Sequence, residues 1–220
     1  MYSPDPYKKL LCDVGKRMYD KSLVVANDGN ISWRIEDNRV LISPSGVCKA
    51  DMTPDMILTI DMDGNVIDGV RVPSGEVEMH LRVYKTMPKR RAVVHAHPPY
   101  AAAFAVAGIQ LSQVIYPTAY GLFGEIPVTK YGTATTSDLA DAVEEHVRMG
   151  KKGILLGNHG ALTCAADLWD AYYLMERVES YAQICLLVRQ LGGGRELNAD
   201  EQEKLQEKIA RQISNGSIYE

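Results

Sequence analysis

Hydrophobic residues in the first third of the chain change from a helical spacing to strand-like segments. From Pro6 to about Ser22, apolar residues recur every three or four positions, which predicts an amphipathic helix with Pro6 in its first turn. Short segments of strand character follow, separated by turn formers. The segments cover residues 31–35, 40–43 and 57–61, and the turns cover residues 36–38 and 63–65. We therefore expect an antiparallel meander here.

The rest of the chain alternates helical patterns with two apolar runs that are typical of buried strands. The predicted strands cover residues 92–97 and 153–156. Helical patterns, several of which open on a proline or a capping residue, cover residues 74–87, 98–107, 136–149 and 167–191. After the glycines at 192–194, Leu205, Ile209 and Ile213 recur at fourfold spacing. This spacing predicts a last amphipathic helix, whose apolar stripe needs a partner.

Strands interspersed with helices after an antiparallel beginning predict an α/β fold, in which helices cover both faces of a sheet. Of the 220 residues, 46% are apolar and 24% are charged, which is the balance of a globular protein with a sizeable core. No linker-like stretch divides the middle of the chain. We therefore expect a single domain over residues 1–220, with a helical tail from about residue 195 to residue 220.

Charge and cysteine usage argue against several classes of function. The formal net charge is −4 and no long basic cluster occurs, so we expect no nucleic acid partner. No apolar run approaches the roughly 18 residues that a membrane span needs. The four cysteines are scattered, and the first residues lack the pattern of a signal peptide. We expect a cytoplasmic protein with reduced thiols; its net charge does not exclude small anionic ligands.

Three histidines are candidate metal ligands. His95 and His97 lie two residues apart on a predicted strand, so both imidazoles leave the same face, and Pro98 ends the strand directly afterwards. His159 follows the second apolar strand in a glycine-flanked turn, where the backbone allows a ligand to approach closely. Three neutral histidines leave an open position on a tetrahedral ion, as in catalytic zinc sites. The alternative is that the strand pair is simply buried and hydrogen-bonded.

A carboxylate and a possible anion site coincide at residues 73–76. Ser74 is expected to cap a helix whose free N–H groups and positive dipole end attract an anion. Glu76 falls in the first turn of that helix, where glutamate is also common simply to offset the dipole. His80, four residues on, is expected to be a buried, hydrogen-bonded helix residue or, as the alternative, a ligand. The glycine turns at residues 28–32 and 43–46 offer further backbone and hydroxyl donors.

Five short motifs together resemble the class II aldolase/adducin family in order and spacing. They are Gly-Asn-Ile-Ser at 29–32, Ser-Pro-Ser-Gly at 43–46, Pro-Ser-Gly-Glu at 73–76, His-Ala-His at 95–97 and Gly-Asn-His-Gly at 157–160. The likeness is strongest to the L-fuculose-1-phosphate aldolase branch and extends to about Leu191. It implies a largely antiparallel central sheet with helices on both faces.

The resemblance also implies roles for individual residues. His95, His97 and His159 would bind one divalent ion per subunit, zinc in the first place and otherwise manganese or cobalt. Glu76 would carry the substrate proton, and Tyr116 would protonate the departing aldehyde oxygen. The phosphate of the substrate would be held by Asn30, Ser45, Gly46, Ser74 and Gly75. The family usually has serine at the last of these positions, so Gly75 removes one hydroxyl while it keeps a backbone donor.

The implied reaction is cleavage of a ketose 1-phosphate, similar to fuculose 1-phosphate, into dihydroxyacetone phosphate and a short aldehyde. The metal would stabilise the ene-diolate, and Glu76, which would return the proton, should then titrate above a free glutamate. Family members similar to this chain are homotetramers with active sites near subunit interfaces. The alternatives are a decarboxylase, 4-epimerase or dehydratase acting on a sugar phosphate or sugar-acid phosphate, a non-catalytic adducin-like interaction module, and a structural zinc site.

Overall fold

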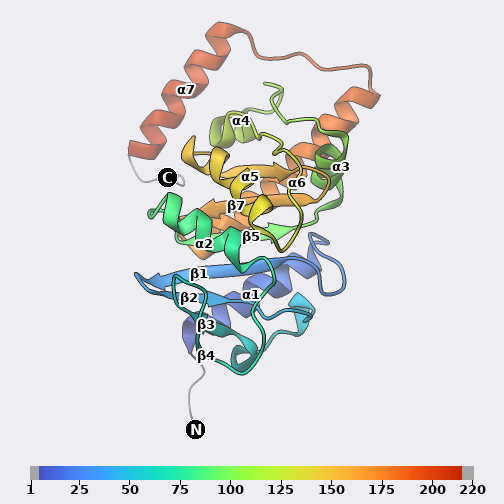
Figure 1. Ribbon diagram of the computed structural model, residues 1–220. Helices are drawn as coiled ribbons and strands as arrows, with labels where there is room; N and C mark the ends of the chain where they lie inside the picture. The colour runs from blue at the N-terminus through green and yellow to red at the C-terminus, as the bar shows by residue number, and fades with distance from the viewer. Residues whose placement is uncertain (1–4, 215–220) are drawn as a thin grey trace.

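The computed structural model describes residues 5–214, and a seven-stranded sheet lies at their centre (Figure 1). Its strands are β1 (Asn30–Glu36), β2 (Arg39–Ile42), β3 (Leu58–Ile60), β4 (Val66–Asp68), β5 (Ala92–Ala96), β6 (Gly153–Leu156) and β7 (Gly160–Ala165). They lie in the order β4-β3-β2-β1-β5-β7-β6, and every neighbouring pair is antiparallel. The predicted meander and the largely antiparallel sheet are confirmed.

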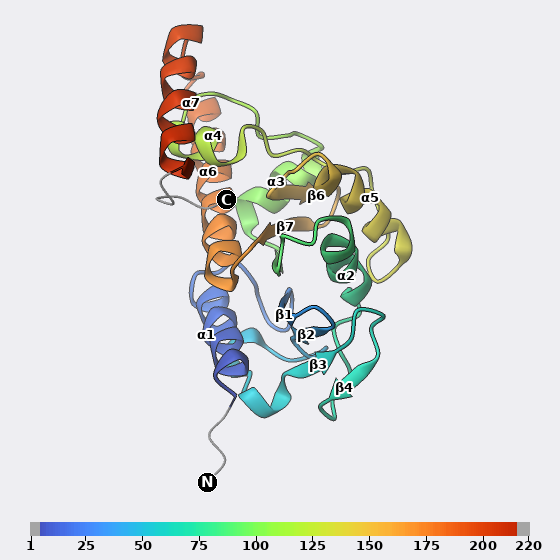
Figure 2. The ribbon, with the colours of Figure 1, turned by 90° about the vertical axis from the view of Figure 1, so that its left-hand side faces the viewer.

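Helices cover both faces of this sheet, as the layered prediction requires. Figure 2 shows α1 and α6 on one side of the strands and α2 and α5 on the other. The helices are α1 (Pro6–Asp20), α2 (Val77–Thr86), α3 (Pro99–Ala107), α4 (Pro117–Phe123), α5 (Ser137–Arg148), α6 (Leu168–Gln190) and α7 (Ala199–Ser214). No helix within residues 5–214 is long and apolar enough to cross a membrane.

The alternation of side chains along the strands builds two cores, one on each face. In β5, Val94 and Ala96 join the core beneath α1, α3 and α6, while Val93 joins the core beneath α2 and α5. All five residues of β5 are buried, because helices cover both of its faces. His95 follows the alternation of Val93 and therefore lies on the α2/α5 side of the sheet.

Three of the strands and α-helices in residues 5–214 were not predicted from the sequence, and the predicted start of one helix was wrong. The unpredicted elements are β4, α4 and β7. Helix α2 begins at Val77 with Glu76 as its N-cap, so Glu76 does not lie within the first turn. The reason is that the Ser74 N–H bonds the Ser43 carbonyl at 3.3 Å, which holds residues 72–75 beside residues 43–46. Ser74 still accepts a hydrogen bond from the Glu76 N–H at 3.3 Å.

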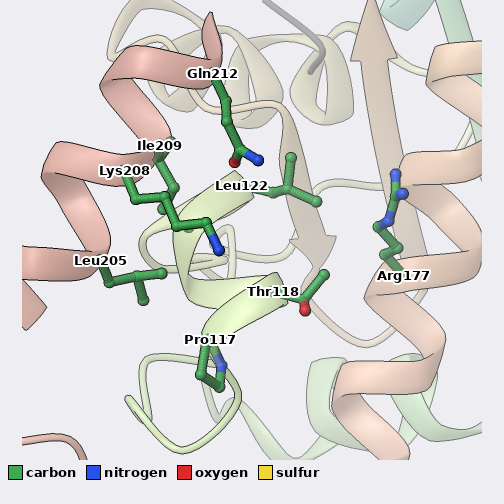
Figure 3. A pocket seen from close by; sticks show the side chains of 9 residues that line it. Pro117, Thr118, Leu122, Arg177, Leu205, Lys208, Ile209 and Gln212 are labelled. Carbon is green, nitrogen blue, oxygen red and sulfur yellow. The ribbon is translucent and has the colours of Figure 1, made fainter. Parts of the chain in front are cut away.

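The C-terminal helix α7 packs against α4 rather than against the sheet (Figure 1). Leu205 and Ile209 point toward α4, and a groove of about 310 Å³ lies between these helices and Arg177 of α6 (Figure 3). A Cβ added at Gly121 would come within 2.2 Å of the end of the Ile209 side chain, so a larger residue there would require this side chain to move. The predicted apolar stripe thus has α4 as its partner, although the side chain of Ile213 lies outside the described residues.

Two glycines with the same backbone conformation allow a matched test of the packing around β1. Gly29 and Gly46 both have φ +71°. A Cβ at Gly29 would lie 2.8 Å from the His95 carbonyl oxygen, whereas a Cβ at Gly46 would have no atom within 4 Å. We expect Gly46→Ala to cost roughly 1–2 kcal/mol of unfolding free energy, because alanine disfavours positive φ. Gly29→Ala should cost on the order of 3–4 kcal/mol, because overpacking adds to this penalty. Equal costs in urea unfolding would contradict the packing described.

Candidate metal centre

Antiparallel pairing brings three distant chain segments to one edge of the sheet. Strand β1 begins at Asn30, and the register places this residue directly opposite His95, near the end of β5. The turn between β6 and β7 lies next to the same edge, because β7 pairs with β5 from Ala96↔Ala161 onward. His97 follows β5, and His159 lies in the β6–β7 turn. The sheet therefore collects all three predicted ligands at the ends of its central strands.

Glycines allow the backbones at this edge to approach each other closely. A Cβ at Gly160 would lie 2.5 Å from the Ala96 carbonyl oxygen, and a Cβ at Gly157 would lie 2.6 Å from the Thr129 carbonyl oxygen. Asn158 adopts a φ of 57°, which tightens the turn before His159. Larger residues at positions 157 and 160 would push this turn away from β5, and His159 would move with it.

The three imidazoles form one compact cluster. One ligand nitrogen from each of His95, His97 and His159 lies within 4.8 Å of the others. The ring centroids are 4.9 Å apart for His95 and His97, 4.7 Å for His95 and His159, and 4.9 Å for His97 and His159. The structure thus brings the three candidate ligands together, as a shared metal ion would require.

The acceptors beside the outer ring nitrogens of His95 and His97 favour tautomers whose lone pairs point toward the centre of the cluster. His95 donates from Nδ1 to the Ala161 carbonyl oxygen at 2.9 Å, and His97 Nδ1 lies 3.5 Å from Asp28 Oδ2. The Nε2 atoms of His95 and His97 then face each other at 3.1 Å as acceptors. Burial lowers the pKa of His95 to about 3, so this ring is neutral at pH 7. Facing lone pairs of this kind fit a divalent cation.

Glu76 borders the histidine cluster. Its Oε2 lies 3.3 Å from His95 Nε2, and its Oε1 lies 3.5 Å from His159 Nε2. The side chain is buried, and Oε1 has no hydrogen-bond partner within the described part of the chain. A buried carboxylate oxygen without a donor is costly, and a cation or a protonated ligand at this position would satisfy it. The arrangement can thus hold a cation and move a proton at neighbouring positions.

The pKa of Glu76 is lower than that of a free glutamate, opposite to the sequence-based expectation. Burial raises this pKa. His95, the hydrogen bond from Asn30 and the remaining nearby histidines lower it, and their combined effect is larger than that of burial. The expectation considered only what an acid/base group needs, and it omitted the donors that surround the carboxylate. Glu76 is therefore anionic at neutral pH and ready to accept a proton.

A chain of buried hydrogen bonds extends from Glu76 into the core beneath α2. Asn30 donates from Nδ2 to Glu76 Oε2 at 2.7 Å, and its Oδ1 lies 2.6 Å from His80 Nε2. Ser32 Oγ then lies 2.7 Å from His80 Nδ1 and 2.5 Å from the Tyr84 hydroxyl. His80 is thus the buried, hydrogen-bonded helix residue of the first interpretation, and not a member of the histidine cluster. Its Nε2–H fixes the orientation of the Asn30 amide.

The predicted phosphate-binding residues lie around the entrance to α2. Residues 43–46 and 72–75 run side by side, with Ser45 N–H bonded to the Val72 carbonyl at 2.9 Å. Ser45, Gly46 and Gly75 are exposed, whereas Ser74 and Asn30 are buried. The Asn30 amide serves Glu76 and His80, which leaves one Nδ2 hydrogen for a further acceptor. The structure thus gathers these residues near Glu76, and their role stays a prediction.

Two further side chains bear on the site: Lys49, which was not among the predicted site residues, and Tyr116, which was. Lys49 is buried and donates to the carbonyl oxygens of Asn27 and Val47, which ties the two glycine turns together. Tyr116 precedes α4 and packs, half-buried, against the core beneath α3 and α6. Within residues 5–214, Tyr116 forms no hydrogen bond or ion pair with the histidine cluster. Its predicted role is not tested by this geometry.

Comparisons with known proteins agree with the fold. Residues 9–186 match the family model "Class II Aldolase and Adducin N-terminal domain". A 5-deoxy-D-ribulose 1-phosphate aldolase of Bacillus thuringiensis is 35% identical, over 89% of this chain and 91% of the relative. A 3-oxo-tetronate 4-phosphate decarboxylase of Haemophilus influenzae is 32% identical, over 80% and 85%. A solved L-fuculose 1-phosphate aldolase superposes with a TM-score of 0.86 at 31% identity, covering 96% of this chain and 98% of the other.

The hydrogen-bonded His80 makes stability depend on pH in a defined window. Burial lowers the pKa of His80 from 6.5 to about 4, so the unfolded chain binds a proton there before the folded chain does. The stabilisation by neutral His80 is complete above pH 6.5 and is lost as the pH falls toward 4. We expect wild-type protein to lose about 3 kcal/mol more than His80→Gln over this range, measured by urea unfolding without metal. Parallel stability curves for the two proteins would contradict this assignment.

Proposed function

Because the chain belongs to the class II aldolase and adducin family, we propose that it is a metal-dependent aldolase. Its substrate would be a ketose 1-phosphate similar to fuculose 1-phosphate, cleaved into dihydroxyacetone phosphate and a short aldehyde. The observation that carries this proposal is the convergence of three imidazole nitrogens beside the anionic Glu76. His95, His97 and His159 would hold one divalent ion, zinc first and otherwise manganese or cobalt.

The proposed reaction breaks the bond between the third and fourth carbons of the ketose. The hydroxyl on the fourth carbon loses its proton and becomes the aldehyde, while the electron pair stays on the third carbon, next to the carbonyl. A divalent ion in the cluster would act as a Lewis acid and withdraw charge from that carbonyl oxygen. Glu76 would exchange the proton of the third carbon, and Tyr116 is assigned the proton of the aldehyde oxygen.

The assignment of Glu76 is supported by its surroundings. The Asn30 amide holds Oε2, while Oε1 faces the cluster without a donor. One oxygen thus orients the carboxylate and the other is available to a substrate proton. A carboxylate held in this way keeps its direction when a proton arrives, which lowers the reorganisation that proton transfer requires.

The phosphate group would lie at the exposed end of the same region. Ser45, Gly46, Ser74 and Gly75 come from two segments that run side by side, and α2 starts directly after them. A helix start of this kind offers free N–H groups and a positive dipole end to an anion. Asn30 would contribute the remaining hydrogen of its amide. A substrate bound here would place its phosphate and its reacting carbons on opposite sides of Glu76.

A second candidate function is decarboxylation of a 3-oxo sugar-acid phosphate. The 32% identity to the Haemophilus influenzae decarboxylase favours it. Loss of CO₂ also leaves an electron pair next to a carbonyl, so the same cluster and the same Glu76 would serve. The two reactions differ in one requirement, because decarboxylation releases no aldehyde and needs no group to take up a hydroxyl proton. Tyr116 would then have no role.

We further propose a cytoplasmic homotetramer with active sites near subunit interfaces. The proposal extends the family resemblance of the chain. It is consistent with Tyr116, which lies half-buried near α4 and away from the hydrogen bonds of its own histidine cluster.

Turnover assays on a defined panel distinguish the two candidate reactions. The panel contains L-fuculose 1-phosphate, 5-deoxy-D-ribulose 1-phosphate and 3-oxo-tetronate 4-phosphate, with dihydroxyacetone phosphate and CO₂ as the measured products. We expect zinc-loaded protein to release dihydroxyacetone phosphate from a ketose 1-phosphate. Glu76→Gln should reduce turnover by about 10²- to 10⁴-fold, because it removes the proton acceptor. The matched variant Glu78→Gln alters an exposed carboxylate two residues away and should be unaffected.

The aldolase and decarboxylase functions are distinguished by their products and by the effect of Tyr116→Phe on turnover. Release of CO₂ without dihydroxyacetone phosphate would establish the decarboxylase, and Tyr116→Phe should then have little effect. If neither product forms, or if Glu76→Gln turns over as fast as wild type, the proposed use of this site is wrong.

Metal removal tests whether the ion is catalytic or structural. Among the described residues, the cluster offers three histidines and no fourth protein ligand other than Glu76. We expect a chelator to abolish turnover while the circular dichroism spectrum and cooperative unfolding persist, because the sheet is held by its own cores. Added zinc should restore activity. Unfolding of the whole chain on chelation would instead indicate a structural ion.

A further inference from the structure

We propose that Thr135 is a further substrate-binding residue, whose hydroxyl replaces the serine hydroxyl that Gly75 lacks. This inference rests on the proposed function, since it requires a phosphate ester as substrate. Gly75 departs from the serine that the family usually carries at this position. When a phosphate site loses a hydroxyl, it either binds phosphate more weakly or receives a replacement donor from elsewhere in the chain.

The side chain of Thr135 occupies the space that a side chain at position 75 would fill. A Cβ added at Gly75 would lie 2.9 Å from Thr135 Cγ2 and 3.5 Å from Thr135 Cβ, and no other atom lies among its near neighbours. A separation of 2.9 Å is too short for two carbon atoms, so a serine at position 75 requires Thr135 to move. The two positions are therefore sterically coupled, although 60 residues separate them in the sequence.

The hydroxyl of Thr135 can reach the same place as its methyl group. Both groups are attached to Cβ, and a rotation about the Cα–Cβ bond to another staggered position places the hydroxyl where the methyl group lies. A hydroxyl placed there would donate a hydrogen bond at the entrance to α2, next to the exposed Gly75 and the buried Ser74. Thr135 is itself exposed, so a ligand has access to it.

The backbone around Thr135 is held in an uncommon conformation. Its φ is 66°, a region that β-branched residues rarely adopt. Thr136, which follows, returns to extended backbone and bonds the Thr133 carbonyl through both its N–H and its hydroxyl, at 3.2 and 2.8 Å. The turn thus directs Thr135 toward Gly75 at a cost in backbone strain. An exposed side chain without a role would not explain this strain.

The segment that carries Thr135 also touches the metal centre. At its other end, Thr129 Oγ1 accepts a hydrogen bond from the Gly157 N–H at 3.1 Å, two residues before His159. The segment from Thr129 to Thr135 therefore spans from the turn of His159 to the residue before Glu76. A hydroxyl at position 135 therefore lies at the Gly75 end of this segment, and Thr129 lies at the end next to the β6–β7 turn.

Titration calorimetry with inorganic phosphate, on zinc-loaded protein, tests the role of the hydroxyl. We expect Thr135→Val, which keeps the shape of the side chain, to weaken phosphate binding about tenfold, because it removes one hydrogen bond to a charged group. Thr133→Val is the matched control from the same loop and should bind as wild type. The KM of the phosphate substrate found in turnover assays should rise in Thr135→Val, with kcat less affected.

A reciprocal exchange tests the coupling. Gly75→Ser alone should lower the melting temperature and weaken phosphate binding, because the new side chain meets Thr135. Thr135→Gly alone should weaken binding while it relieves the positive φ. The double variant Gly75→Ser/Thr135→Gly should regain wild-type affinity to within about threefold, so that the effects of the single variants are far from additive.

The outcomes separate this inference from the function on which it rests. If wild type and Thr135→Val bind phosphate equally, the inference is wrong and the aldolase proposal is unaffected. Additive effects in the exchange would also overturn it. If wild-type protein binds no phosphate and turns over no phosphate ester, the proposed function and the inference fail together.

Discussion

Close approach of three strand ends is the constraint on which the rest of the site depends. The start of β1, the end of β5 and the β6–β7 turn reach the same edge only because the central pairs are antiparallel. Their backbones come close enough because Gly29 and Gly160 lie against the carbonyl oxygens of His95 and Ala96. Imidazole side chains are short, so a separation larger by one side chain would prevent the three rings from sharing an ion. The packing of the sheet therefore determines whether the imidazoles at its edge can share an ion.

The electrostatics of the site follow from where its protons are held. The Ala161 carbonyl oxygen accepts the outer N–H of His95, and the Asp28 carboxylate lies 3.5 Å from the outer nitrogen of His97, which leaves lone pairs inside the cluster. The hydrogen-bond chain from Tyr84 to Asn30 ends by donating to Glu76 and keeps it anionic. Neutral nitrogens and one negative carboxylate together suit a divalent cation and a proton acceptor. This arrangement is supported from the core, because the residues of the hydrogen-bond chain are buried.

Local patterns in the sequence predicted much of the fold and the ligands, but not the contacts between distant segments. The helices with clear apolar periodicity, the meander and the three histidines were all predicted, since each depends on neighbours in sequence. Strand β7 was missed because its small residues show no alternation, and α4 because it is short. The start of α2 was placed too early, because its position depends on the pairing of Ser74 with Ser43. The link from Asn30 to His80 and the contact of Gly75 with Thr135 join residues 50 and 60 positions apart, which no local pattern reveals.

The central claim is that His95, His97 and His159 hold one divalent ion together. X-ray absorption at the zinc edge, on protein loaded with one equivalent of zinc, measures the ligands of that ion directly. The account predicts three imidazole nitrogens at about 2.0–2.1 Å, completed by oxygen and without sulfur. Fewer than three imidazoles, or a sulfur ligand at about 2.3 Å from one of the four cysteines, would contradict it.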